Sequence, residues 1–183
     1  MATYPGTTIE TLCIRKNSSK ILFEGIFAAG GITMSQVSNM TGLEPYIIQN
    51  WVKRKFLSPP VKKLYSSEQF SRILIINMRR DSLQLESICN LIDVIAGEPD
   101  DKSDDLIADE ELYHRYVNMI SEWDIDLYNK EDILKRAELA TEDFNEKNAG
   151  DRQKLVKILL VMLYAHMSSR LRDTAKEIIS SMW

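Results

Sequence analysis

Four polar side chains fall on one face of a short predicted helix, where their chemistry suits contact with DNA bases. They are Tyr46, Gln49, Asn50 and Lys53, at helical spacing. Gln and Asn can each make two hydrogen bonds to an adenine edge, Lys can reach a guanine edge or a phosphate, and Tyr can contact a sugar or a phosphate. On the helix alone the pattern favours a solvated polar face over one that reads a DNA groove, and the features around the helix shift the balance towards the groove.

Basic side chains gather around this predicted helix. Between positions 44 and 80 the sequence holds eight Lys and Arg against two Glu, although the whole chain has a net charge of −4. Local positive charge suits the neutralisation of phosphates with release of counterions. The predicted DNA-binding residues are Ser35, Tyr46, Gln49, Asn50, Lys53, Arg54, Lys62, Lys63 and Tyr65.

Two short helices joined by a tight turn would position the polar face. Thr33 and Gln36 form a capping-box pattern, which predicts that the first helix begins at Met34. Gly42 is expected to end that helix, because Gly readily adopts the left-handed backbone of a C-terminal cap. Pro45 suits the first turn of the second helix. The residues of the second helix that are expected to be buried are Ile48, Trp51 and Val52.

A basic loop follows the second helix. Pro59 and Pro60 stiffen the chain ahead of Lys62 and Lys63, as in a wing that projects from a helix-turn-helix. Ser66 and Gln69 repeat the capping-box pattern and predict another helix. That helix is expected to contain Phe70, Ile73, Leu74, Ile76 and Asn77. A further amphipathic helix over positions 85–95 is expected to close the unit.

Positions 32–95 resemble the MerR-like winged-helix regulators. The matching segments are Gly42-Leu43 at the end of the helix-turn-helix, Lys55-Phe56-Leu57, Pro59-Pro60, and Lys63-Leu64-Tyr65-Ser66 at the end of the wing. The run from Ile47 to Lys53 also looks like part of a little-characterised bacterial family of unknown function with a MerR-like front half. The resemblance implies a DNA-binding winged helix-turn-helix.

The sequence departs from the MerR pattern in three ways, one of which is a wing shorter than usual. Gln49 replaces the family Arg that contacts the DNA backbone, so phosphate contacts would fall to Lys53, Arg54 and Lys63. The path to the long dimerisation helix of that family is interrupted by Gly97-Glu98-Pro99-Asp100-Asp101. Dimerisation by the usual route of the family is therefore not expected.

The predicted fold class is all-α: a winged helix-turn-helix domain followed by a small helical bundle. The expected units are an N-terminal extension with one helix (1–31), the winged domain (32–95), an acidic linker (96–105) and a C-terminal helical domain (106–183) for dimerisation or signal response. The linker is expected because eight Asp and Glu but one Lys fall between positions 97 and 111. The front of the chain is basic and its back is acidic.

Three helical patterns fill the back half of the chain. Asn129 is the expected N-cap of the second helix, and the third runs over about 151–182. The apolar positions of the first two helices are Leu112, Tyr116, Met119, Ile120 and Trp123, then Ile133, Leu134, Ala137, Ala140 and Phe144. In the third, positions 155–165 are apolar almost all round, and a narrower stripe follows at Leu171, Ala175, Ile178 and Met182. A homodimer through this helix is the preferred interpretation, and a purely internal role is the alternative.

Other kinds of site have little support in the sequence. There is no phosphate-binding Gly loop, no dinucleotide motif, no nucleophile motif and no convincing set of metal ligands, so we expect no enzyme activity, cofactor or metal. Six aromatic residues could line a pocket for a small-molecule effector, although such residues more often fill a core. They are Tyr113, Tyr116, Trp123, Tyr128, Phe144 and Tyr164.

The expected location is the cytoplasm, without contact with a membrane. Cys13 and Cys89 are too few for a disulfide framework, and the longest apolar run, positions 158–165, has eight residues where a membrane span needs about twenty. The leading hypothesis is a sequence-specific transcriptional regulator that binds double-stranded DNA as a homodimer. The alternative is an adaptor that keeps the helix-turn-helix fold but binds an acidic protein surface.

Overall fold

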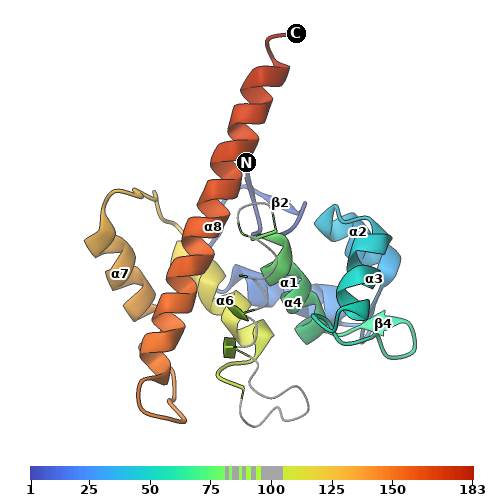
Figure 1. Cartoon of the computed structure of the whole chain (residues 1–183), viewed down its shortest axis with the longest axis horizontal. Coiled ribbons are helices and arrows are strands. Elements are labelled where there is room, and N and C mark those ends of the chain that lie inside the picture. Colours follow the sequence, from blue (N-terminus) through green and yellow to red (C-terminus); the bar gives the residue numbers. More distant parts are fainter. Residues whose placement is uncertain (81–82, 84–86, 88–89, 92–93, 96–104) are drawn as a thin grey trace.

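The computed structural model describes residues 1–80, 83, 87, 90–91, 94–95 and 105–183, and it is mostly helical (Figure 1). The elements are β1 (Ala2–Thr3), β2 (Glu10–Thr11), α1 (Ser18–Phe27), β3 (Ile32–Thr33), α2 (Met34–Thr41), α3 (Pro45–Lys53), β4 (Leu64–Tyr65), α4 (Ser67–Asn77), α6 (Asp109–Ile120), α7 (Lys130–Leu139) and α8 (Asp151–Ser180). The helix predicted over 85–95 and the acidic linker lie largely outside the described residues. Among the described helices, none combines the length and apolar composition needed to span a lipid bilayer.

Helix α2 begins and ends, and α3 begins, at the predicted residues. The Thr33 side chain accepts a hydrogen bond from Gln36 N at 3.3 Å, and Gln36 Oε1 accepts one from Thr33 N at 2.8 Å, which completes the capping box. Gly42 ends α2 with a φ of 68°, and Pro45 opens α3. These predictions are confirmed. They could be made from the sequence because each signal lies within a few residues of the helix end that it sets.

Two small antiparallel sheets, which the sequence patterns did not predict, complete the front half. In one, β3 pairs with β4, so that Ile32 lies opposite Tyr65 and Thr33 lies opposite Leu64. In the other, β1 pairs with β2 inside the N-terminal extension, for which we predicted one helix alone. Each strand has two residues, which is too short to show the alternation of apolar and polar positions that marks a strand.

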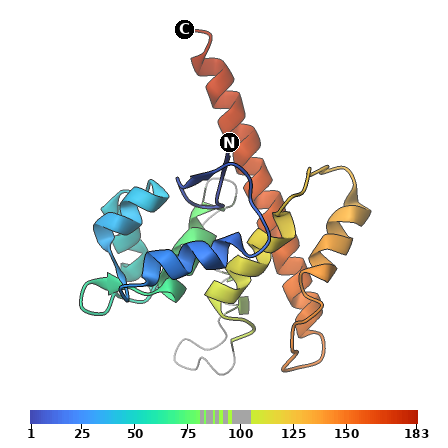
Figure 2. The ribbon, with the colours of Figure 1, turned by 180° about the vertical axis from the view of Figure 1, so that it is seen from behind.

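The N-terminal segment packs on both halves of the chain. The Phe23 ring of α1 lies 5.6 Å from the ring of Phe70 in α4 and 5.5 Å from that of Tyr113 in α6. Figure 2 shows the ribbon of α1 beside those of α4 and α6. Asn77 of α4 donates a hydrogen bond to the carbonyl of Gly6 at 2.9 Å. The buried apolar residues form one contiguous cluster that runs from Tyr4 through to Leu163. The front and back halves therefore share a core.

The back half packs α6 and α7 against the long helix α8. Asn129 caps α7 by accepting a hydrogen bond from Asp132 N at 3.1 Å, as predicted. Ile133 and Ala137 are buried, but Leu134 is exposed, so its predicted place on the apolar face is wrong. Leu134 directly follows the buried Ile133, and a turn of about 100° per residue moves it to the edge of the packed face. The C-terminal part of α8 extends beyond the rest of the molecule (Figure 1).

Candidate nucleic-acid interface

The polar face of α3, defined as Tyr46, Gln49, Asn50 and Lys53, is open to solvent at all four positions. Ile48 and Trp51 on the opposite side are buried in the core and Val52 is half-buried, as predicted. Burial of this apolar side fixes the rotation of the helix about its axis. The four polar side chains therefore project from one exposed surface.

The C-terminal end of α3 adds two exposed cations to this surface. The helix ends at Arg54, and Lys55 follows with a left-handed backbone, φ 62°. Lys55 N donates to the carbonyl of Val52 at 3.1 Å, and Phe56 N donates to that of Trp51 at 2.9 Å. The Arg54 guanidinium lies 5.1 Å above the Phe56 ring, which holds the cation beside the helix end.

A tight basic hairpin, residues 61–64, lies at the end of the loop that follows α3. Val61 and Leu64 exchange two backbone hydrogen bonds of 3.0 and 2.9 Å, with Lys62 and Lys63 between them. Both lysines have left-handed backbones, with φ 49° and 66°, as a type I′ turn requires. Asn-Gly is the favoured pair for such a turn, and a left-handed backbone costs other residues roughly 1–2 kcal/mol each. The hairpin thus exposes two lysines at positions where lysine is conformationally unfavourable.

The base of the hairpin is fastened to the fold. The Gln69 side-chain amide of α4 donates to the carbonyls of Ser58 and Pro59, each at 3.0 Å. After the turn, β4 pairs with β3. The backbone comes close to β4 at Gly31, where an added Cβ atom would lie 2.8 Å from the Cβ of Leu64. The two lysines are therefore held in position relative to α2 and α4.

The predicted DNA contact of Tyr65 is wrong for its side chain. Tyr65 is 1% exposed, its hydroxyl contacts the sulfur of Met34, and burial raises its pKa. The reason is the alternation of side chains along β4, because Leu64 faces solvent and the next residue must face the core. Ser35, in contrast, is exposed in the first turn of α2.

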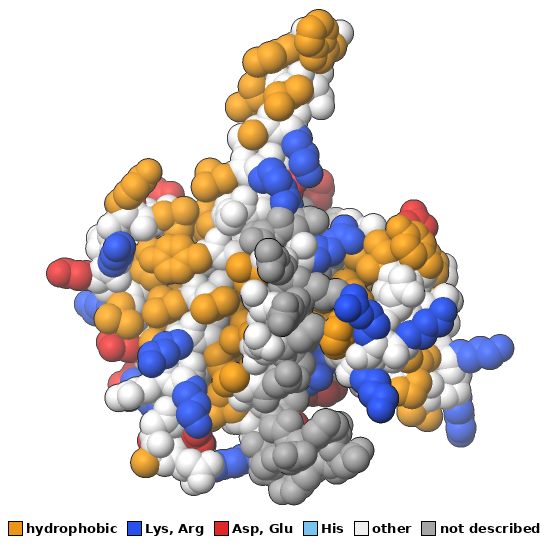
Figure 3. Space-filling model, viewed as in Figure 1, with side chains coloured by type: hydrophobic (Ala, Val, Ile, Leu, Met, Phe, Trp, Pro, Cys, Tyr) orange, Lys and Arg blue, Asp and Glu red, His pale blue; other side chains and the backbone are white. Residues whose placement is uncertain are grey.

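The basic charge near α3 is smaller than the sequence count suggested. Arg79 is fully buried, and burial lowers its pKa to about 10. Arg72 forms an ion pair with Asp109. The basic side chains that remain exposed around α3 and the hairpin are Lys53, Arg54, Lys55, Lys62 and Lys63. Figure 3 shows Lys and Arg side chains gathered over this part of the molecule.

A second set of charges joins the first turns of α4 and α6, and we call this contact the junction. The Glu68 carboxylate accepts hydrogen bonds from the backbone N–H groups of Asp109, at 2.6 Å, and Glu110, at 3.0 Å. Arg72 Nε lies 2.6 Å from Asp109 Oδ2, and Ser67 donates to the Glu110 carboxylate. Burial outweighs the nearby Arg72 guanidinium and raises the pKa of Asp109 to about 6. Sequence analysis missed the junction because its partners lie about forty positions apart.

The predicted aromatic residues do not line one common pocket. Tyr113 and Tyr116 fill the core, whereas Tyr128 and Tyr164 are exposed. Trp123 donates its indole N–H to Asp132, and Phe144 lies beneath the Arg115 guanidinium. Cavities of about 540, 440 and 740 Å³ instead surround the first half of α6, and of the six aromatics Phe144 alone borders one of these three.

Each histidine takes part in a hydrogen bond, buried for His114 and partly buried for His166. His114 Nδ1 lies 2.9 Å from the Ser19 hydroxyl, and His166 Nδ1 lies 2.7 Å from the Tyr116 hydroxyl. Burial lowers the pKa of both rings, that of His166 to about 4. In the part of the chain that the structure describes, no group of three or more His, Cys, Asp or Glu side chains is arranged to hold a metal ion.

An exposed polar helix beside a basic hairpin defines a candidate surface for a polyanion. Residues 30–116, which contain this surface, match the family model described as Domain of unknown function (DUF1836). The chain is 25% identical over 162 residues to the Uncharacterized protein YkrK of Bacillus subtilis (strain 168), an alignment that covers 82% of this chain and 70% of that protein. No solved structure matches the chain. The matches support the predicted similarity to a family of unknown function, and the likeness to MerR regulators stays a prediction.

Proposed function

We propose that this chain is a sequence-specific DNA-binding transcriptional regulator with a MerR-like winged helix-turn-helix. In this proposal α2 and α3 form the helix-turn-helix, α3 enters the major groove, and the basic hairpin is the wing. The observation that carries the proposal is the polar face of α3, exposed at all four positions and accompanied by the exposed lysines of the hairpin. Gln49 and Asn50 would contact base edges, and Lys53, Arg54, Lys62 and Lys63 would contact phosphates.

The conformation of the hairpin supports a role for its charges. Lys62 and Lys63 stand where Asn and Gly would fold more favourably, and within the described part of the chain neither forms an ion pair. Residues held in sparsely populated backbone regions concentrate at functional sites. Two lysines at the tip of a fastened turn suit phosphate contact, because the backbone holds their positions before DNA binds.

We also propose that the regulator acts as a homodimer, so that two copies bind the two halves of an inverted repeat. Helix-turn-helix dimers bind half-sites about one helical turn apart, or multiples of it, because each copy presents one recognition helix. The alternative is an adaptor that binds an acidic protein surface. It is favoured by two exposed apolar side chains, Tyr46 at the start of α3 (62%) and Val61 next to the hairpin lysines (71%).

The test is selection from a pool of random duplexes at near-physiological salt, followed by sequencing of the bound fraction. An enriched inverted repeat would support a dimeric regulator, and an enriched single half-site would support a reader that binds as a monomer. Absence of enrichment would contradict the regulator and favour the adaptor. Repeating the selection at higher salt separates specific from non-specific binding, because phosphate contacts alone would lose affinity steeply for every sequence.

A further inference from the structure

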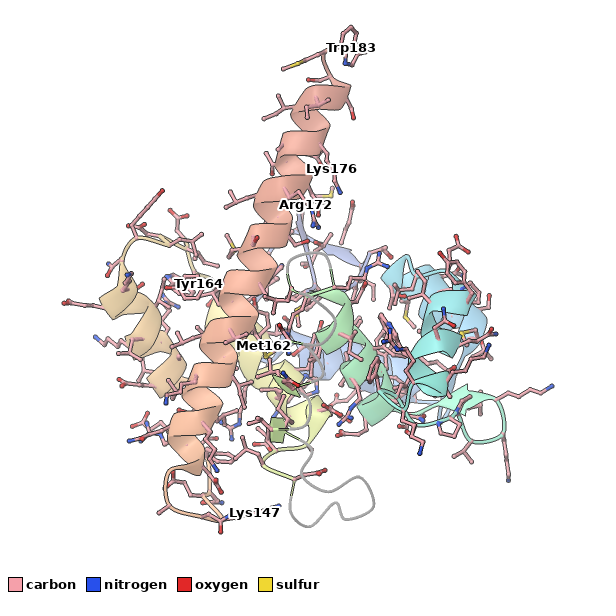
Figure 4. The ribbon with its side chains drawn as sticks, viewed as in Figure 1. Lys147, Met162, Tyr164, Arg172, Lys176 and Trp183 are labelled. Atoms are coloured by element: carbon pink, nitrogen blue, oxygen red, sulfur yellow. The ribbon has the colours of Figure 1, made fainter. Side chains whose placement is uncertain are left out.

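The long helix α8 has two unlike parts. In its first half Leu155, Ile158, Leu159 and Met162 are buried against the rest of the molecule. Within residues 105–183, which the structure describes throughout, no side chain beyond Ala165 is buried. The helix nevertheless continues to Ser180, and Trp183 lies at its free tip (Figure 4). We call residues 168–183 the overhang.

An exposed seam runs along α8 from the packed half into the overhang. Its members follow each other at alternating spacings of three and four: Val161, Tyr164, Ser168, Leu171, Ala175, Ile178 and Met182. All seven are exposed, and the five large apolar ones are between 39% and 67% exposed. Figure 4 shows Tyr164 pointing away from the side that carries Met162. The seam therefore lies on a different side of α8 from its buried contacts.

The spacing of the seam is that of a coiled coil. A strict average of 3.5 residues keeps apolar side chains facing one partner helix over several turns, whereas packing on a globular core needs no such regularity. From Val161 to the end of α8 at Ser180 the seam covers 20 residues, or about 30 Å of helix at 1.5 Å per residue, and Met182 lies just beyond that end. An overhang with this pattern is complementary to a second helix of similar length.

The sizes of the seam residues favour a second copy of α8 in antiparallel orientation. With a two-fold axis between positions 169 and 170, Tyr164 faces Ala175 of the second copy and Leu171 faces Ser168. Each of these two contacts joins a large side chain to a small one, as interdigitated packing requires. The same axis places Val161 opposite Ile178, an aliphatic pair, and Met182 level with Lys157. A parallel pair would instead place Tyr164 against Tyr164 and Ala175 against Ala175, which leaves crowded layers beside empty ones.

Charge and area agree with a second copy as the partner. The overhang carries three basic and two acidic side chains, too balanced to attract a polyanion. At roughly 60–120 Å² for each of the five large aliphatic side chains and about 200 Å² for each of the two aromatic ones, the seam with Ile179 and Trp183 exposes on the order of 700–1,000 Å² of apolar area. Two copies that covered most of it would bury an area within the roughly 1,200–2,000 Å² of stable interfaces.

We propose that α8 is the homodimer interface, and that two copies pair through the seam as an antiparallel two-stranded coiled coil. Only the role of the dimer rests on the proposed function: the dimer would place two copies of α3 so that each binds one half of an inverted repeat. The interface itself forms without DNA. Its partner is an identical α8, because the same seam residues fill both sides of the contact.

The first test measures the mass of the full chain in solution, without DNA, by sedimentation. Wild type should have twice the chain mass of 21.1 kDa. The variant Leu171→Glu/Ile178→Glu should be monomeric, with the dimer dissociation constant raised more than about 100-fold, because two buried anchors become charged in each copy. Both positions are exposed in the single chain, so the variant should keep the wild-type circular dichroism spectrum.

The matched control is Ser180→Glu, which adds a charge to the same overhang away from the seam. It should leave the dimer intact. A monomeric wild type, or a Leu171→Glu/Ile178→Glu variant that still forms dimers, would overturn the interface. The Lys63→Glu variant should keep the mass of a dimer even if it no longer binds DNA. Failure of the interface and failure of the DNA-binding function therefore give different results.

A second test determines the orientation of the pair. In a background of Cys13→Ser/Cys89→Ser, single variants Tyr164→Cys and Ala175→Cys are prepared. Mild oxidation of their mixture should cross-link one variant to the other, because those positions face each other in the antiparallel pair. Cross-linking of Ala175→Cys to itself alone would overturn the antiparallel arrangement, since it requires parallel helices.

Discussion

The polar face of α3 with its hairpin and the junction between α4 and α6 use charge in opposite ways. At the junction, charged groups meet partners: Arg72 lies 2.6 Å from Asp109, and Glu68 accepts from two backbone N–H groups. At the hairpin, Lys62 and Lys63 are exposed and held in an unfavourable backbone conformation. The charges of the junction are therefore matched by partners inside the fold, whereas those of the hairpin face solvent.

This difference separates stability from binding. An intact buried ion pair adds little net stability, but loss of one partner leaves the other buried without compensation and strongly destabilises the fold. Exposed charges without partners contribute little to stability, and surface substitutions usually change it by less than about 0.5 kcal/mol. Substitutions in the two regions should therefore affect different measurements. The predictions below test that separation, beginning with the largest effect.

The largest effect is expected at the junction. Arg72→Met should lower the free energy of unfolding at pH 7.5 by about 3 kcal/mol, because Asp109 stays buried without its cation. Lys53→Met, a similar change on the polar face of α3, should lower it by less than about 0.5 kcal/mol. Urea denaturation of both variants measures the difference. Equal losses would contradict the comparison between the two regions.

The same junction predicts a pH dependence with a definite sign. The folded-state pKa of Asp109, about 6, lies above its ordinary value of 3.8, so the folded chain binds this proton more tightly than the unfolded chain. The stability due to the neutral carboxyl is present below pH 3.8 and is lost as pH rises through 6. Asp109→Asn should remove this loss, and the destabilisation by Arg72→Met should be smaller at pH 4.5 than at pH 7.5. A destabilisation independent of pH would place its cause elsewhere.

Much of the helical framework could be predicted from the sequence because its signals are local. The caps at Thr33, Gly42, Ser66 and Asn129 involve partners within four residues, and the structure confirms each. The exposed side of α3 was also predictable, because the spacing of Ile48 and Trp51 fixes which side is buried.

The remaining features depend on contacts between distant residues. Nothing near Asp109 in the sequence indicates Arg72 or Glu68 as its partner, so the junction could not be found. Lys62-Lys63 carries no turn signal, because a type I′ turn is normally marked by Asn or Gly. The burial of Tyr65 follows from its pairing with Ile32, which is set by the fold of the intervening helices.

A smaller effect is expected when one hairpin charge is reversed. Lys63→Glu should weaken DNA binding by about 10–100-fold for every duplex, because a charge-assisted contact to a phosphate is worth roughly 1.5–3 kcal/mol. The slope of log affinity against log salt should become shallower by about one. The free energy of unfolding should stay the same. Titration of specific and random duplexes at several salt concentrations checks this, and a loss limited to one sequence would show that Lys63 reads a base.

The polar face of α3 predicts a more selective change. Asn50→Ala should reduce discrimination at one base pair by about 1–2 kcal/mol, because a bidentate contact to an adenine edge is lost. Affinity for random duplexes should hardly change. Repeating the pool selection with this variant gives the preference at each position. If the whole preference profile stayed intact, Asn50 would not face the groove and the placement of α3 would be wrong.

The smallest expected effect is a gain in stability that separates backbone strain from charge. Replacing Lys62-Lys63 with Asn-Gly should raise the free energy of unfolding by about 1–2 kcal/mol, since those residues suit the left-handed turn. It should also weaken DNA binding, because both cations are lost.

The matched control, Ala at both positions, removes the same charges but keeps the strain, so it should weaken binding equally without stabilising the fold. If Asn-Gly stabilised the fold and left affinity unchanged, the hairpin would not contact DNA. A stabilised variant with weaker binding would show that the turn holds its lysines for the ligand at the expense of the fold.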